Sequence, residues 1–123
     1  MIENQISYEI RGAIFKVYNA IGPGLLESVY QHLLVYELRK RELDIRSEVP
    51  LPVYYDNIKI DIGFRADIIV ENQVIVELKS VEQLLPIHHK QLLTYLKITG
   101  LKLGILVNFN TLNINKSIFR KIN

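Results

Sequence analysis

Residues 64–79 read FRADIIVENQVIVELK and predict two β-strands joined by a tight turn at Glu71-Asn72. Asp67 belongs to the first strand, and Glu77-Leu78-Lys79 ends the second. Strand side chains alternate with a period of two, so Glu77 and Lys79 share one face of the second strand. The other face carries only apolar residues, namely Val74, Val76 and Leu78. In such a hairpin Asp67 and Glu77 come close together, and two like charges repel unless a cation lies between them.

Hard carboxylate oxygens of this kind suit Mg²⁺ or Mn²⁺, which keep several waters and bind through one or two carboxylates plus a substrate phosphate. Such an ion would activate a water and neutralise charge on the phosphorus, while Lys79 would stabilise the transition state or orient the water. A purely structural interpretation stays open. Asp67 would then pair with Arg65 or Lys79, and Glu77 with Lys79, in ion pairs that are worth little when exposed.

The surrounding sequence predicts helices on either side of these strands. Apolar spacing predicts a helix over residues 5–20, and Gly22-Pro23-Gly24 separates it from a second helix over residues 25–42. A third helix is expected to begin at Pro86 and to stop at Gly100. Further extended segments are expected over residues 45–55, 58–70, 103–109 and 113–122. A meander followed by a helical crossover gives one α/β domain over residues 1–123, an α+β mixed sheet of four to five strands flanked by helices.

Glu27 lies near the start of the second predicted helix, on its apolar face beside Tyr30. A carboxylate in the first helical turn is also favoured by the helix dipole, which is a sufficient structural reason for it. Glu37 shares the same face but has Arg41 four residues later as an expected partner, whereas Glu27 has only Gln31. A buried carboxylate without a partner needs a metal, a hydrogen-bond donor or a proton, so Glu27 is a third candidate ligand.

On the third predicted helix, His88, Gln91 and Tyr95 share one face, and His89 belongs with the leucines on the packed face. A core aromatic ring is the structural alternative for Tyr95, and a hydrogen bond to the edge of the sheet is the alternative for Gln91. Adjacent His88 and His89 point in different directions, so they do not form a zinc site.

The composition excludes several classes of protein. A hydrophobic content of 49% with 23% charged residues is typical of a globular domain, and a net charge of +2 permits nucleic acid as a partner without arguing for it. Because the chain has no cysteine, disulfides and thiolate chemistry are excluded. The N-terminus lacks the layout of a signal peptide, and no apolar run approaches the ~20 residues that cross a bilayer. We therefore expect a soluble cytoplasmic domain without a membrane partner.

Together these residues resemble the PD-(D/E)xK nuclease superfamily, which has the restriction-endonuclease-like fold. More narrowly, Gly24-Leu25-Leu26-Glu27-Ser28-Val29-Tyr30 resembles the motif of the small GxxExxY family. Residues 91–95 resemble the QxxxY motif that follows the lysine in related exonucleases and is thought to touch the nucleic acid. The similarity covers nearly the whole chain. One departure is that Ala66 replaces the proline of the superfamily's name.

The resemblance implies a metal-dependent nuclease that hydrolyses phosphodiester bonds of nucleic acid, with DNA favoured. It assigns catalysis to Glu27, Asp67, Glu77 and Lys79. One or two Mg²⁺ or Mn²⁺ ions would be held by Glu27, Asp67, Glu77 and the Leu78 carbonyl. Substrate would be bound by Tyr30, His88, Gln91 and Tyr95.

The alternative is a non-catalytic module that binds nucleic acid or protein and keeps the nuclease scaffold. The mild net charge and small size favour it, and a rim of basic residues would contact phosphate, namely Lys97, Lys102, Lys116, Arg120 and Lys121. A third interpretation is a subunit that needs a partner protein or a second copy of itself.

Overall fold

The computed structural model describes residues 1–61 and 63–123. Two helices come first, α1 (Glu3–Ile21) and α2 (Glu27–Lys40), and α3 (Pro86–Thr99) lies between strands β5 (Val74–Lys79) and β6 (Leu103–Asn108). The other elements are β1 (Ile45–Pro50), β2 (Val53–Tyr55), β3 (Ile58–Ile60), β4 (Arg65–Val70), the 3-10 helix η1 (Ile114–Ser117) and β7 (Ile118–Ile122). The predicted order is thereby confirmed for the three helices and for the strands β1, β4, β5, β6 and β7.

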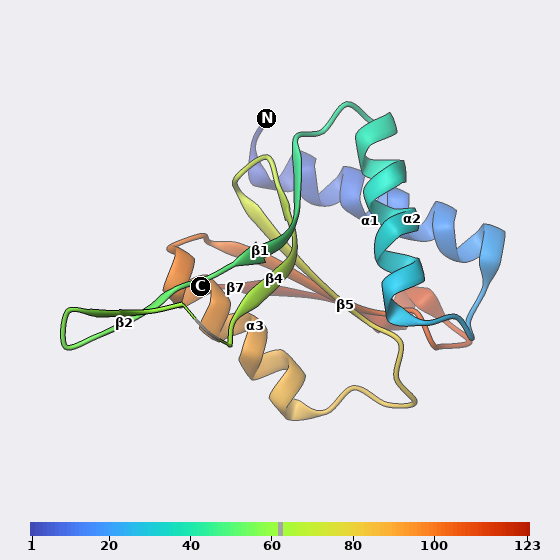
Figure 1. Ribbon diagram of the computed structural model, residues 1–123. Helices are drawn as coiled ribbons and strands as arrows, with labels where there is room; N and C mark the ends of the chain where they lie inside the picture. Colours follow the sequence, from blue (N-terminus) through green and yellow to red (C-terminus); the bar gives the residue numbers. More distant parts are fainter. Residues whose placement is uncertain (62) are drawn as a thin grey trace.

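Five strands form one mixed sheet in the order β1-β4-β5-β6-β7. The pair β5–β6 is parallel and the other pairs are antiparallel, because α3 carries the chain back across the sheet before β6 begins. Helices α1 and α2 cover one face of the sheet and α3 covers the other, as Figure 1 shows. The sheet is therefore the middle layer of three.

Strand β5 is buried on both faces and shows the predicted alternation. Val74, Val76 and Leu78 pack in the core beneath α1 and α2, whereas Ile75 belongs to the core beneath α3. Glu77 follows Ile75 on the α3 side and is one of two buried polar residues in the described part of the chain. The sheet thus carries an acidic side chain into an otherwise apolar layer.

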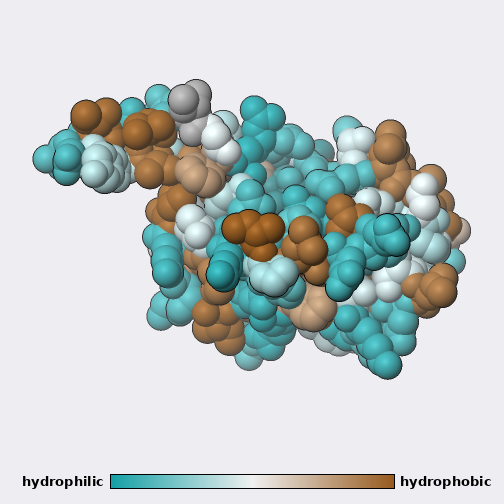
Figure 2. All heavy atoms as spheres, turned by 90° about the horizontal axis from the view of Figure 1, so that it is seen from below, coloured by the Kyte–Doolittle hydropathy of each residue, from teal (hydrophilic) through white to brown (hydrophobic). Residues whose placement is uncertain are grey.

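The segments predicted as single strands over residues 45–55 and 58–70 are each divided in two. β2 and β3 leave the main sheet and form their own two-stranded hairpin, which projects from the body in Figures 1 and 2. The break after β1 falls at Leu51-Pro52, where proline cannot donate to a ladder. Ile62, within the second predicted strand, lies outside the described residues. The hairpin exposes Tyr54, Tyr55 and Ile58.

Helix boundaries agree with the sequence signals within two residues. α3 starts at Pro86 and its C-cap is Gly100, which has a positive φ of 75° that favours glycine. The predicted last strand over residues 113–122 is divided between η1 and β7. Within the described residues we found no helix that combines the length and the apolar character needed to cross a membrane.

Candidate active site

Strands β4 and β5 separate at the level of Asp67 and Glu77. Their paired residues run from Val70–Val74 to Ile68–Val76 and stop there. Beyond that point side chains replace the ladder: the Asp67 N–H donates to Glu77 Oε1 at 3.1 Å, and the Leu78 N–H donates to Asp67 Oδ2 at 3.0 Å. Each carboxyl group thus holds the backbone of the neighbouring strand. The two acids predicted to meet do so, and we call them the acid pair.

The acid pair is buried, and burial makes it energetically unfavourable for both carboxyl groups to be charged. Glu77 is only 4% exposed, and burial followed by the negative charge of Asp67 raises the pKa of Glu77 to about 9. Burial also raises the pKa of Asp67, against the opposing effects of its hydrogen bonds with Glu77 and Leu78 and of the Lys79 charge. The two groups titrate as a unit, and at neutral pH that unit keeps a proton.

A divalent cation suits this donor set because it would replace the shared proton. Two hard carboxylates beside a positively charged lysine are the protein ligands that Mg²⁺ and Mn²⁺ use when water and a phosphate complete the coordination. Among residues 1–61 and 63–123, no three Asp, Glu or His side chains are grouped closely enough to hold a metal. The protein's own contribution is therefore the acid pair, and the Leu78 carbonyl stays a predicted further ligand.

Glu27 is neither buried nor without a basic partner, so that part of the prediction is wrong. Its side chain is 40% exposed, and its Oε1 lies 3.9 Å from Lys79 Nζ. The cause is the position of α2, whose first turn lies at the end of β5, where Ser80 Oγ donates to the Leu25 carbonyl at 2.6 Å. Lys79 therefore stands between Glu27 and the acid pair, and a role for Glu27 as a metal ligand stays a prediction.

The expected partner of Glu37 is also wrong. Glu37 Oε1 lies 3.5 Å from Lys40 Nζ and 3.7 Å from Lys16 Nζ, while Arg41 bonds to Glu9 at 3.1 Å. Two of these pairings join α1 to α2 and involve partners far apart in the sequence. Local spacing along one helix therefore misassigned the pairing.

Helix α3 brings Tyr95 to the acid pair from the other side. Tyr95 is 3% exposed and packs edge-to-face on Phe64 with ring centroids 5.8 Å apart. Burial, then the negative charge of Glu77, raises the pKa of Tyr95, while a hydrogen bond with the Arg65 backbone lowers it. Tyr95 is thus a core aromatic residue, which was the structural alternative for this position. Its hydroxyl lies close enough to the acid pair to be affected by the charges of the two acids.

The other predicted substrate contacts on α3 are closer to its N-terminus. His88 Nδ1 accepts a hydrogen bond from the Leu85 N–H at 3.0 Å and so caps the helix. Gln91 is half-buried one turn before Tyr95. His89 lies on the packed side, where its ring meets Phe119 edge-on at 5.0 Å. Gln91 and His88 stay predictions as substrate contacts.

Tyr30 is fully buried and has a structural role. Its ring stacks on Phe109 with centroids 4.5 Å apart. Its hydroxyl donates to the Gly22 carbonyl and accepts from the Leu25 N–H, and so fixes the turn between α1 and α2. A ring with no exposed surface cannot touch a bound strand, so this position does not support the predicted substrate contact.

Three polar residues next to the acid pair were not among the predicted site residues. Gln31 Nε2 donates to Glu48 Oε1 at 2.8 Å and, at 3.4 Å, to the backbone carbonyl of Asp67. Arg65 pairs with Glu48 at 3.4 Å. Glu48 lies within β1 but has a positive φ of 52°, and the β1–β4 ladder skips its pairing with Asp67. The one sequence signal for any of them was that Gln31 follows Glu27 by four residues and so lies on the same face of α2.

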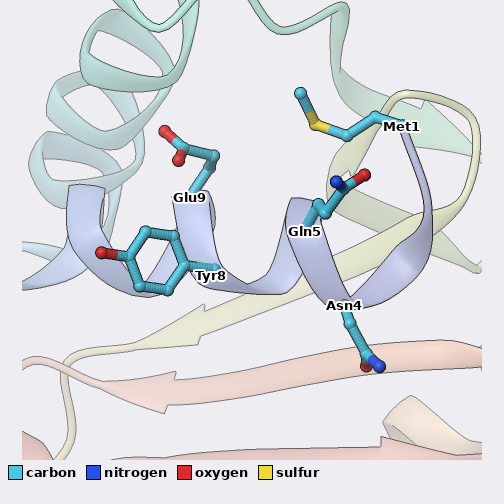
Figure 3. A pocket seen from close by; sticks show the side chains of 5 residues that line it. All are labelled: Met1, Asn4, Gln5, Tyr8 and Glu9. Carbon is cyan, nitrogen blue, oxygen red and sulfur yellow. The ribbon is translucent and has the colours of Figure 1, made fainter.

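A separate hollow of about 620 Å³ lies beside the N-terminal half of α1 and is lined by the five residues shown in Figure 3, Met1, Asn4, Gln5, Tyr8 and Glu9. None of them belongs to β4 or β5, the two strands that carry the acid pair. This hollow is therefore not part of the candidate active site.

The comparisons with known proteins agree with this geometry. A family model described as the PD-(D/E)XK nuclease superfamily matches residues 4–121. Searches of curated proteins and of solved structures each found no match. Three α-helices around a mixed five-stranded sheet, within the described residues, agree with the restriction-endonuclease-like fold expected for that superfamily. Because the match covers nearly the whole chain, the protein belongs to the PD-(D/E)XK nuclease superfamily.

Proposed function

We propose that this protein is a metal-dependent nuclease that hydrolyses phosphodiester bonds, with DNA as its favoured substrate. Membership of the superfamily suggests nuclease activity, and nucleases of this superfamily generally use divalent metals. The observation that carries the proposal is the buried acid pair, because two carboxyl groups side by side at the end of the β4–β5 ladder form a donor set that suits a divalent cation. We also assign the chain to the GxxExxY group on residues 24–30 and expect it in the cytoplasm.

A divalent cation, when bound, supplies positive charge at the phosphate that is attacked. The residues of this chain do the rest. Asp67 and Glu77 hold the cation at the end of β5, with the Leu78 carbonyl as a further ligand. Lys79 donates to a phosphate oxygen or to the attacking water, and Glu27 keeps the ammonium group in place through their ion pair. Gln91 contacts the bound nucleic acid on the α3 side, and Tyr95 packs in the core behind it.

A cleavage assay tests this proposal. Purified protein is incubated with labelled single- and double-stranded DNA and RNA in Mg²⁺, in Mn²⁺ and in EDTA. Lys79→Ala should reduce cleavage by about 100-fold or more, comparable to removing one preorganised charge, and should leave thermal stability unchanged. Lys16→Ala is the matched control, because Lys16 lies on α1 in a similar ion pair with Glu37. Equal cleavage by wild type and Lys79→Ala in the presence of metal would refute the mechanism.

The second candidate is a non-catalytic module that binds nucleic acid or protein, alone, as a homodimer or with a partner protein. This candidate is favoured because only two acids are grouped among the described residues, and one shared proton between them can neutralise the excess negative charge without a metal. Calorimetric titration with Mn²⁺ separates the two candidates. A nuclease site should bind the ion and lose it in Asp67→Asn. A binding module should show no such difference, and its affinity for oligonucleotides should fall steeply with salt.

A further inference from the structure

A second polar pocket, of about 280 Å³, lies between α2 and β1 next to the acid pair. We call it the α2–β1 pocket, and its lining residues are Ser28, Gln31, His32, Val35, Arg39, Ser47 and Glu48. Five of them come from α2 and two from β1. Its size is at the lower end of the range for small-molecule sites, which suits a single small polar ring better than a large ligand.

The α2–β1 pocket shares a wall with the candidate active site. Gln31 spans the two, because its Nε2 bonds both to Glu48 inside the pocket and to the carbonyl of Asp67. One helical turn earlier, Glu27 pairs with Lys79. Glu27 contacts Lys79 of β5 and Gln31 contacts the Asp67 carbonyl of β4, so this row of α2 lies against those two strands, and the row that begins at Ser28 lines the adjacent pocket. Gln31 is therefore the contact at which the pocket and the candidate active site adjoin.

The lining offers hydrogen-bond acceptors, one apolar wall and a cation. His32 Nδ1 lies 2.9 Å from the Ser28 carbonyl and must carry the hydrogen there, which leaves Nε2 as an acceptor when the ring is neutral. Glu48 supplies further carboxylate acceptors, and Val35 supplies the apolar surface. Arg39 is exposed and has no ion pair among the described residues. Acceptors beside an apolar side chain suit the polar edge and the face of a nucleobase, and an exposed guanidinium suits a phosphate.

We propose that the α2–β1 pocket binds an unpaired base of the nucleic-acid strand, at the nucleotide next to the phosphate that Lys79 contacts, and that Arg39 binds a following phosphate. Arg39 lies eight residues after Gln31, a distance of about 12 Å along α2, which leaves room for the intervening nucleotide. This inference rests on the proposed function and adds the substrate contact. Because a paired base cannot enter the pocket, the protein should prefer single-stranded or frayed ends to intact duplex.

Binding measurements without cleavage test the base contact. Fluorescence anisotropy in EDTA compares a labelled single-stranded oligonucleotide with an abasic oligonucleotide that has the same number of phosphates. Wild type should bind the abasic strand about 10-fold more weakly, as expected when one base contact is lost. Ser47→Ile fills the pocket from an exposed strand position that favours β-branched residues, so the fold should be kept. In that variant the difference between the two strands should fall to about 2-fold or less.

The salt dependence of binding tests the phosphate contact. In Arg39→Ala the slope of log affinity against log salt should decrease by about 1, as expected for one lost phosphate contact. Arg46→Ala is the matched control, because Arg46 is an exposed arginine of β1 whose Nε bonds to Asn72 at 3.1 Å, away from the pocket. Its slope should equal that of wild type.

The outcomes separate this inference from the proposed nuclease function. One outcome is that the protein cleaves nucleic acid, while Ser47→Ile keeps the wild-type difference between the two strands and Arg39→Ala keeps the wild-type salt slope. That outcome would refute the proposed base and phosphate contacts and leave the nuclease function standing. Pocket-dependent binding without any cleavage in metal would overturn the nuclease function and support the pocket. A protein that binds no oligonucleotide would overturn both.

Discussion

Replacing Glu77 by glutamine should stabilise the metal-free protein, although Glu77 is central to the candidate active site. Glutamine keeps the side-chain oxygen that accepts the hydrogen bond from the Asp67 N–H, and it removes the need to bury a second carboxyl group. Its amide N–H groups can also donate to Asp67. The substitution therefore keeps the contact between the strands and removes the electrostatic cost.

The magnitude follows from the pKa of Glu77, which rises from 4.5 to about 9 on folding. Because the pKa is raised in the folded state, the stabilising effect of protonation is complete below pH 4.5 and is lost as the pH rises toward 9. Over that window each pH unit costs wild type about 1.4 kcal/mol, so the loss between pH 5 and pH 8 is about 4 kcal/mol. Glu77→Gln has no such proton, and its advantage over wild type should grow by about that amount.

Urea unfolding at pH 5, 6, 7 and 8 in EDTA measures the effect as a difference in unfolding free energy. The control is Glu37→Gln, which neutralises a second glutamate with a side chain only 12% exposed but paired with two lysines. That control should lose up to about 1 kcal/mol and show no growing advantage with pH. Adding Mg²⁺ at 100 times its dissociation constant should stabilise wild type by about 2.7 kcal/mol and the Glu77→Gln variant by much less. A Glu77→Gln protein that is less stable than wild type at pH 8 in EDTA would refute the account of the acid pair.

Two further substitutions test the packing that supports the site. Gly104→Ala should lower the unfolding free energy by about 1–3 kcal/mol, because the new Cβ would lie 2.8 Å from the side chain of the fully buried Leu92. In the same urea titration the control Gly12→Ala should cost less, because its Cβ would meet only the flexible guanidinium of Arg41, at 2.9 Å. Tyr30→Phe should cost about 1–3 kcal/mol in thermal or urea unfolding by leaving polar groups of the 22–25 turn unpaired, and no loss of stability would contradict the structural role assigned to that hydroxyl.

The fold was predictable from the sequence because its strongest signals are local. Alternating side chains define β5, and Pro86 and Gly100 define the ends of α3. The acid pair was predictable for the same reason, since a short turn fixes which residues of a hairpin lie opposite each other. The division of residues 45–55 was missed because a proline-rich extended segment does not reveal where a strand leaves its sheet.

The surroundings of the site depend on contacts that the sequence does not display. A helical wheel indicates which side of α2 Glu27 occupies but not how far the first turn extends past the end of the sheet, and that extension leaves Glu27 half exposed beside Lys79. The positive φ of Glu48 has no sequence signature, because glycine or asparagine would be expected there. Gln31 became significant only when its contact with Asp67 placed it between two sites.

Asp67 and Glu77 fasten β4 to β5 where the ladder stops, so a side-chain oxygen at each position also supports the fold. Selection for a well-folded chain would therefore keep an acceptor at both positions even after hydrolysis had ceased to matter. Finding side-chain acceptors at these two positions in a related polypeptide therefore indicates its architecture, and only a pair of carboxylates indicates its activity. Asp67→Ala would remove the acceptor of the Leu78 N–H, so a loss of activity in that variant could come from a loss of folding. Asp67→Asn retains an acceptor and therefore reports on the chemistry alone.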